Sequence, residues 1–183
     1  VDAAKVLEES YTIEDIYNLP QGKRAELIDG EIYMMASPST IHQRLVMALS
    51  NRIYNYIDSK QGSCEVFPSP FAVFLNADNE IYLEPDISVI CDKSKITDEG
   101  CKGAPDWVIE IVSQSSKRMD YYIKLFRYRT AGVKEYWVVD PEKNHVIVYD
   151  FEHDEVMDYT FSDKVKAGIY EDLEIDFSEI QME

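Results

Sequence analysis

The chain has 183 residues, of which 45% are hydrophobic and 12% aromatic, so it can fold as one domain around a buried core. Its 35 acidic residues outnumber the 18 lysines and arginines, and the net charge of −17 excludes a general electrostatic attraction for nucleic acid. No run of about 18 apolar residues exists, which excludes a spanning helix and predicts no membrane partner.

The first residues lack the basic and apolar regions of a signal peptide. Cys64, Cys91 and Cys101 are odd in number and have no metal-ligand spacing. We therefore expect three reduced, unpaired thiols and a cytoplasmic location.

The N-terminal part predicts a short helix and a hairpin. Residues 12–19 begin with a capping-box-like pattern, in which Asp replaces the usual Glu, and predict a helix. Residues 24–36 contain two β-like runs joined by Asp29-Gly30, the strongest short signal of a β-hairpin. Glu26 and Glu31 flank this turn, and each is either a solvated strand residue or a residue that points into a site.

The middle of the chain predicts one long helix followed by strands. Apolar residues recur every three or four positions from about residue 40 to residue 60, which indicates an amphipathic helix. Residues 64–76 and 80–90 each read as a strand run, separated by a turn composition. The charged residues 91–104 predict a loop or a short connector.

The C-terminal part predicts a strand, a helix and a second hairpin. Residues 105–113 read as a strand, and the following helix ends near Thr130 because Gly132 suits the position after a helix. Residues 135–150 predict a hairpin, and residues 151–183 predict a strand plus a loose acidic tail.

This order of elements predicts a mixed α/β fold with a central mixed β-sheet flanked by helices and with N-terminal and C-terminal β-hairpins. The strand–helix–strand step from Trp107 to Val139 is long enough for a crossover and predicts a parallel pair. We expect a single domain over residues 1–183, with a core of about residues 12–150 and an acidic extension of residues 151–183.

Two carboxylates interrupt apolar strand runs. Asp86 and Glu110 stand among β-branched residues, and burial of an isolated carboxylate costs several kcal/mol unless it is paired or binds a cation. The pattern predicts a divalent metal site held by Asp86, Glu110 and the carbonyl of Ile111. The alternative is that both acids lie on the solvated face of a sheet.

The helix that follows carries a polar stripe. Asp120, Lys124 and Tyr128 recur every four positions, so Lys124 could place a cation beside the two carboxylates. The alternative is a surface ion pair between Asp120 and Lys124. For a Lys124 that acts beside the carboxylates we expect Lys124→Ala to leave folding nearly intact, because a lysine on a helix surface contributes little to stability. The other face of the helix is predicted to pack in the core and contains Met119, Tyr122, Ile123 and Phe126.

Several motifs together resemble the Uma-two family, a bacterial group of restriction-endonuclease-like proteins in the PD-(D/E)XK nuclease superfamily. The resemblance covers about residues 12–149. It rests on residues 26–32 and 85–89, residues 103–113 and 132–141, Asp120-x3-Lys124-x3-Tyr128, and the Ser-Pro pair followed by His42.

The resemblance implies a restriction-endonuclease-like core that binds Mg²⁺, or alternatively Mn²⁺. Asp86 and Glu110 match the acidic residues of the motif, and Glu26 matches a family glutamate near the metal. The lysine expected two residues after Glu110 is Val112 here, and Lys124 matches the position that takes over its role. His42 matches too, without an assigned role.

The favoured function is therefore a Mg²⁺-dependent endonuclease that acts on DNA as a homodimer. The alternative is a catalytically silent nuclease-fold module that binds a protein or nucleic-acid partner. An enzyme acting on a small phosphorylated metabolite would need a glycine-rich phosphate loop, which the sequence lacks. A cluster of basic residues at the mouth of the acidic pocket would favour the nuclease, and the candidates are Lys117, Arg118, Arg127 and Arg129.

Overall fold

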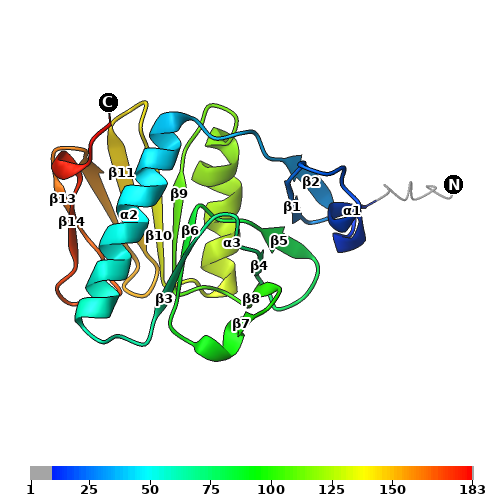
Figure 1. The fold of residues 1–183 in the computed structure, drawn as a ribbon, viewed down its shortest axis with the longest axis horizontal. Helices are drawn as coiled ribbons and strands as arrows, with labels where there is room; N and C mark the ends of the chain where they lie inside the picture. Colours follow the sequence, from blue (N-terminus) through cyan, green and yellow to red (C-terminus); the bar gives the residue numbers. More distant parts are fainter. Residues whose placement is uncertain (1–9, 183) are drawn as a thin grey trace, which may run out of the picture.

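The computed structural model describes residues 10–182. The expectations for residues 1–9 and for residue 183, including their place in the predicted single domain, lie outside the described residues. Its main helices are α1 (Ile13–Tyr17), α2 (Thr40–Ser59), the π-helical turn η2 (Met119–Ile123) and α3 (Lys124–Ala131). Helix α2 crosses one face of the larger sheet, and α3 lies on the other side (Figure 1). Within residues 10–182 every helix is too short or too polar to cross a membrane.

The larger sheet has six strands and forms the centre of the fold. Its strands in spatial order are β12 (Glu155–Thr160), β11 (His145–Asp150), β10 (Glu135–Asp140), β9 (Trp107–Ile111), β6 (Ile87–Ile90) and β3 (Glu65–Pro68). β9 and β10 run parallel, and the other neighbouring pairs are antiparallel. This confirms the parallel pair predicted from the strand–helix–strand step.

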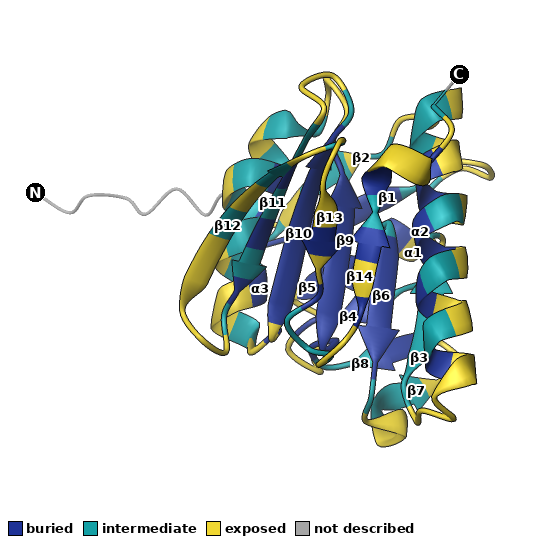
Figure 2. Cartoon of the chain, turned by 90° about the vertical axis from the view of Figure 1, so that its left-hand side faces the viewer, coloured by how far each residue is buried: buried dark blue, intermediate teal, exposed yellow. Residues whose placement is uncertain are grey.

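Strand β9 separates two apolar clusters because its side chains alternate between the faces of the sheet. Trp107 and Ile109 pack in the cluster that contains the buried face of α2. Val108 packs in the second cluster, together with Tyr128 of α3. By the same alternation Glu110 faces the η2–α3 helix. Figure 2 shows these buried strands between the two helices.

A second six-stranded sheet lies beside the first. Its strands in spatial order are β2 (Glu31–Met34), β1 (Ala25–Ile28), β5 (Ile81–Leu83), β4 (Val73–Phe74), β8 (Gly100–Lys102) and β7 (Ile96–Thr97). The β1–β2 hairpin is confirmed, and Asp29 and Gly30 both have positive φ, at 54° and 78°, as a type I′ turn requires.

Three expectations about strands are wrong. Residues 64–76 and 80–90 are not single strands, because each run is divided between the two sheets. Pro70 and Pro85 lie at these breaks, and proline has no N–H with which to continue a ladder. Residues 91–104 are not only a loop, since they form the short helix η1 (Lys93–Lys95) and the hairpin β7–β8.

The expectation of three unpaired thiols is also wrong. Cys64 and Cys91 form a disulfide, and Cys101 alone is a free, buried thiol. The register of β3 with β6 explains the bond, because Glu65 lies opposite Ile90 and the two cysteines are the next residues outward on each strand. This pairing depends on which strands meet, which cysteine spacing does not reveal.

The C-terminal part is more ordered than a strand with a loose tail. β12 completes the larger sheet, and the hairpin β13 (Lys164–Lys166) with β14 (Glu174–Asp176) follows it. Val165, Ile175 and Phe177 are buried in the same apolar cluster as α2, and Phe177 begins the short helix η3 (Phe177–Glu179). The alternation of apolar residues there is short and is interrupted by acids, which explains why the sequence pattern was weak.

Candidate active site

Asp86 and Glu110 lie side by side where β6 and β9 meet, because Ile87 is paired with Ile109. The Ile111 N–H donates to Asp86 Oδ2 at 2.7 Å, and the Asp86 N–H donates to Glu110 Oε2 at 3.4 Å. Asp86 stands just before β6 rather than inside a strand. Glu110 is 2% exposed, so the alternative of a solvated face is wrong for this residue.

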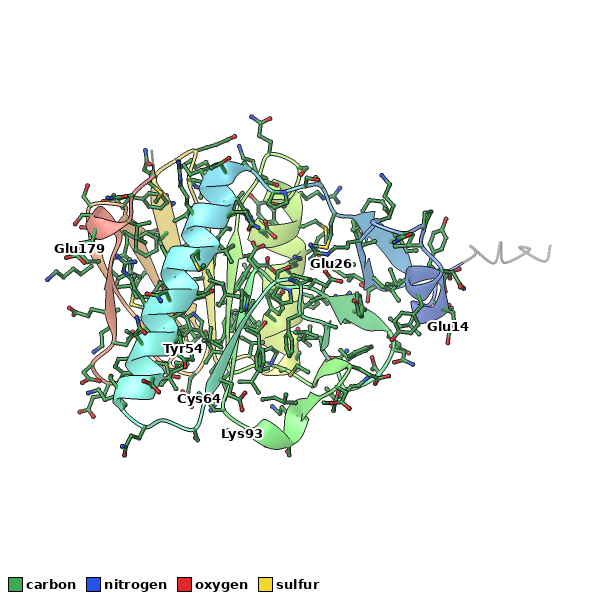
Figure 3. All side chains as sticks on the ribbon, viewed as in Figure 1. Glu14, Glu26, Tyr54, Cys64, Lys93 and Glu179 are labelled. Carbon is green, nitrogen blue, oxygen red and sulfur yellow. A yellow bond between two sulfur atoms is a disulfide. The ribbon has the colours of Figure 1, made fainter. Side chains whose placement is uncertain are left out.

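Lys124 lies among the carboxylates of three other elements. Its Nζ is 2.9 Å from Glu110 Oε1, 2.9 Å from Glu26 Oε2 and 3.7 Å from Asp120 Oδ1. The Tyr128 hydroxyl donates to the same Glu110 Oε1 at 2.7 Å. Of the two acids that flank the hairpin turn, Glu26 is buried and Glu31 is exposed. Figure 3 labels Glu26 on the side of the hairpin that faces the rest of the molecule.

The buried and exposed sides of the η2–α3 helix differ from the expected ones. Asp120 and Lys124 are buried, whereas Tyr122 and Phe126, expected in the core, are 72% and 60% exposed. The surface ion pair considered for Asp120 and Lys124 is therefore wrong, and so is the surface position of Lys124 from which the small effect of Lys124→Ala on folding was expected. The π-helical turn, which the sequence did not predict, begins one residue before Asp120 and ends just before Lys124.

Burial and mutual repulsion shift the protonation of these groups. Desolvation, with the charges of neighbouring acids, raises the pKa of Glu110 well above its usual value, although Lys124 opposes the rise. Desolvation likewise raises the pKa of Asp120 to about 6. Burial alone would lower the pKa of Lys124, but Glu110, Glu26 and Asp120 raise it well above its usual value. Lys124 therefore stays charged, and its charge favours the ionised forms of Glu110 and Asp120 against the effect of burial.

His42 and Arg24 are close to the carboxylates, and sequence reasoning gave neither a role. His42 Nε2 lies 3.1 Å from Asp86 Oδ1. The Arg24 guanidinium donates from Nε to Glu84 at 2.6 Å and from its other end to Ser69 Oγ at 2.7 Å. His42 had matched the family pattern, but no local pattern connects Arg24 with Glu84, 60 residues away.

These groups line one cavity of about 640 Å³ between the β1–β2 hairpin, the start of α2 and the loop after β9. Its basic lining residues are Arg24, His42 and Lys124, and its rim carries neutral polar side chains, among them Ser39, Ser113 and Ser116. The four basic residues expected at the mouth do not line the described cavity. Three of them pair with carboxylates elsewhere: Lys117 with Glu142, Arg127 with Asp29 and Arg129 with Asp154.

The carboxylates that line the cavity are ligands of the kind that a hard divalent cation prefers. Within residues 10–182 no group of three or more His, Cys, Asp or Glu side chains is arranged to hold a metal by itself, and the ammonium of Lys124 lies between the acids. However, Glu26, Asp86, Glu110 and Asp120 provide carboxylate oxygens, which Mg²⁺ and Mn²⁺ prefer. Asp120 Oδ1 is buried without a hydrogen-bond partner among the described residues, and a single lysine, Lys124, faces the three buried acids Glu26, Glu110 and Asp120.

Residues 8–177 match the model of the Uma2 family, whose description is "Putative restriction endonuclease". A Synechocystis protein, uncharacterized protein sll1609, is 32% identical over 121 residues, which is 64% of this chain and 67% of that protein. A second one, slr1290, is 27% identical over 80% of this chain and 77% of its own length. The crystal structure of a "putative nuclease belonging to DUF820" from Anabaena variabilis has a TM-score of 0.73 at 22% identity, covering 92% of this chain and 96% of that one. The fold is thus shared with that protein.

Proposed function

Because this chain belongs to the Uma2 family, we propose that it is a metal-dependent endonuclease that hydrolyses phosphodiester bonds of DNA. The observation that carries the proposal is the buried group formed by Glu26, Glu110 and Lys124 beside Asp86, at the floor of a cavity. A structural core has little reason to bury three acids, Glu26, Glu110 and Asp120, around one lysine, since apolar residues of similar size would cost less.

In this proposal Asp86, Glu110 and the Ile111 carbonyl hold Mg²⁺ or Mn²⁺. A divalent cation held there would supply the chemistry of a Lewis acid, which polarises a phosphoryl oxygen and lowers the pKa of water. Backbone hydrogen bonds support this role. The Ile111 N–H donates to one carboxylate oxygen of Asp86, and the Asp86 N–H donates to one carboxylate oxygen of Glu110, so the two side chains are held next to each other.

Lys124 supplies positive charge where negative charge grows on the phosphate during attack. Its ammonium is held by Glu26 and Glu110, so it needs no reorganisation during the reaction. Tyr128 orients Glu110 from the same helix. Glu26 in turn accepts the N–H of Glu84 at 3.0 Å, so the residue that follows β5 helps to hold the Glu26 carboxylate in place.

A second candidate function is a module that keeps the fold but binds a partner without catalysis. The observation that favours it is the absence of Lys117, Arg118, Arg127 and Arg129 from the lining of the described cavity, on a chain with net charge −17. Such a surface suits a basic protein partner better than duplex DNA.

A cleavage assay with Mg²⁺ or Mn²⁺ on linear, supercoiled, branched and single-stranded DNA tests the proposal. We expect metal-dependent products with the wild type and loss of at least a hundredfold in rate with Asp86→Asn, a nearly isosteric change. Analytical ultracentrifugation would test the homodimer, which would help one active site per chain to cut both strands of a duplex. If the folded wild type cuts none of the substrates, the module without catalysis is the better description.

A further inference from the structure

The floor of the cavity is accessible only to a narrow substrate. Glu26, Glu110 and Lys124 are each at most 4% exposed, so a phosphate that meets them must enter the cavity. A volume of about 640 Å³ is typical of a site for a small ligand. It accepts a nucleotide or two but not the width of a duplex. An unpaired strand can bring its phosphate to the floor of such a cavity more easily than a duplex can.

Beside this cavity, the outer side of the η2–α3 helix carries two exposed aromatic rings. Tyr122 and Phe126 lie one helical turn apart, and we call these two side chains the aromatic face. Large rings are usually buried, and two together on one exposed helix face mark an interaction surface.

Three arginines belong to the same helical segment as the aromatic face: Arg118, Arg127, which pairs with Asp29, and Arg129, which pairs with Asp154. The Arg127 guanidinium lies 5.3 Å from the centre of the Phe126 ring, and Arg129 lies 5.7 Å from the ring of Phe151. Arg118, one turn before Tyr122, is exposed. From residue 117 to residue 131 the one acidic residue is Asp120, which is buried on the other side. On a chain with net charge −17, this helix is locally basic.

Tyr33 of β2 connects the aromatic face with the cavity. It lines the cavity, and it also lines a hollow of about 370 Å³ with Tyr122, Phe126 and Arg127. The two acids of the hollow are engaged, since Asp29 pairs with Arg127 and Glu31 accepts the Tyr33 hydroxyl at 2.7 Å. A strand that leaves the cavity over Tyr33 therefore meets the rings of Tyr122 and Phe126 and the guanidinium of Arg127.

We propose that the aromatic face binds a single-stranded segment of nucleic acid, with bases stacked on Tyr122 and Phe126, while a neighbouring phosphate lies in the cavity. The proposal rests on the proposed nuclease function and adds its substrate class. Stacking on aromatic side chains beside Arg is the usual way to hold a single strand without reading its sequence. It also suits an acidic protein, because stacking depends less on net charge than phosphate contacts do.

Fluorescence anisotropy with a labelled oligothymidylate and a labelled duplex of equal length, in EDTA to prevent cleavage, tests this inference. We expect the wild type to bind the single strand more tightly than the duplex. The double variant Tyr122→Ala/Phe126→Ala should bind the single strand at least tenfold more weakly, since each stacked base contributes about 1–3 kcal/mol. Tyr54→Ala is the matched control, because Tyr54 is 58% exposed on α2 (Figure 3) and should leave binding unchanged.

Equal affinity of the double variant and the wild type for the single strand, or a preference of the wild type for the duplex, would overturn the inference. A double variant that turns a dimer into a monomer, with unchanged binding, would assign the aromatic face to a contact between copies of this chain instead. Binding is measured without metal, so the result does not depend on cleavage. If the nuclease proposal alone fails, the single strand still binds through the aromatic face, but it is not cut when Mg²⁺ is added.

Discussion

The ammonium of Lys124 lies 2.9 Å from Glu110 Oε1, and both side chains are almost completely buried. In the superfamily pattern the lysine would stand two residues after the acid, where this chain has Val112. Val112 lies on the same face of the sheet as Glu110 and packs in the apolar cluster below α3. The cation thus comes to Glu110 from the opposite helix instead of from its own strand.

Lys124→Ala should destabilise the fold by about 3–5 kcal/mol, because it leaves Glu26 and Glu110 buried without a counter-charge. Urea unfolding of the metal-free protein at pH 8 measures this loss. Lys143→Ala is the matched control, since Lys143 is 60% exposed and its loss should change stability by less than about 0.5 kcal/mol. Equal stability of the two variants would mean that the acids are protonated or reach water.

Tyr128→Phe should cost about 1.5–3 kcal/mol, because the hydroxyl donates to a charged acceptor, Glu110. Tyr136→Phe provides the comparison, since the Tyr136 hydroxyl is equally buried but donates to the neutral carbonyl of Asp120 at 2.7 Å. Its loss should cost about 0.5–1.5 kcal/mol. Chemical unfolding of both variants checks the order, and a larger loss for Tyr136→Phe would contradict a charged Glu110.

Local signals predicted the hairpin and the long helix, because Asp29-Gly30 and a regular apolar period determine structure within a few residues. Asp86 and Glu110 were predicted to lie together because each carboxylate interrupts an apolar run, and the structure places them side by side. The burial of Lys124 and the exposure of Tyr122 and Phe126 were not predicted. A π-helical turn leaves no periodic signal in the sequence, and the strands that carry Glu26 and Glu110 are distant from Lys124 along the chain. The Cys64–Cys91 bond was missed because it depends on strand register.

Asp86→Ala should weaken the binding of Mg²⁺ or Mn²⁺ strongly, since it removes one of the two adjacent carboxylates that define the proposed site. Isothermal titration calorimetry of the wild type and the variant checks this. Asp58→Ala, on the exposed side of α2, should bind like the wild type. If Asp86→Ala and the wild type bind equally, the cation occupies another part of this acidic chain.

Reduction of the Cys64–Cys91 disulfide should lower stability by about 3–4 kcal/mol, because the bond closes a loop between residues 27 positions apart and so restricts the unfolded chain. Urea unfolding with and without dithiothreitol measures the change. The double variant Cys64→Ser/Cys91→Ser should be unaffected by dithiothreitol. A wild type whose midpoint does not respond to the reductant would show that the two thiols are unpaired in solution.

Asp120→Asn should stabilise the metal-free protein more at high pH than at low pH. Burial raises the pKa of Asp120 from 3.8 to about 6, so the folded state binds its proton more tightly than the unfolded state does. The cost of ionised Asp120 is therefore absent below about pH 4, grows as the pH rises towards 6 and is constant above that. A shift of about two pKa units corresponds to about 3 kcal/mol, and this is the expected difference between the effects of Asp120→Asn at pH 8 and at pH 4.

Urea unfolding in EDTA at several pH values measures this difference, with Asp58→Asn on the exposed side of α2 as the control. Because a loss of packing in the variant would be the same at both pH values, a difference of this sign comes from titration of Asp120 or of Glu110, whose pKa Asp120 also raises. An effect of Asp120→Asn that does not change with pH would mean that the Asp120 carboxylate reaches solvent in the folded protein.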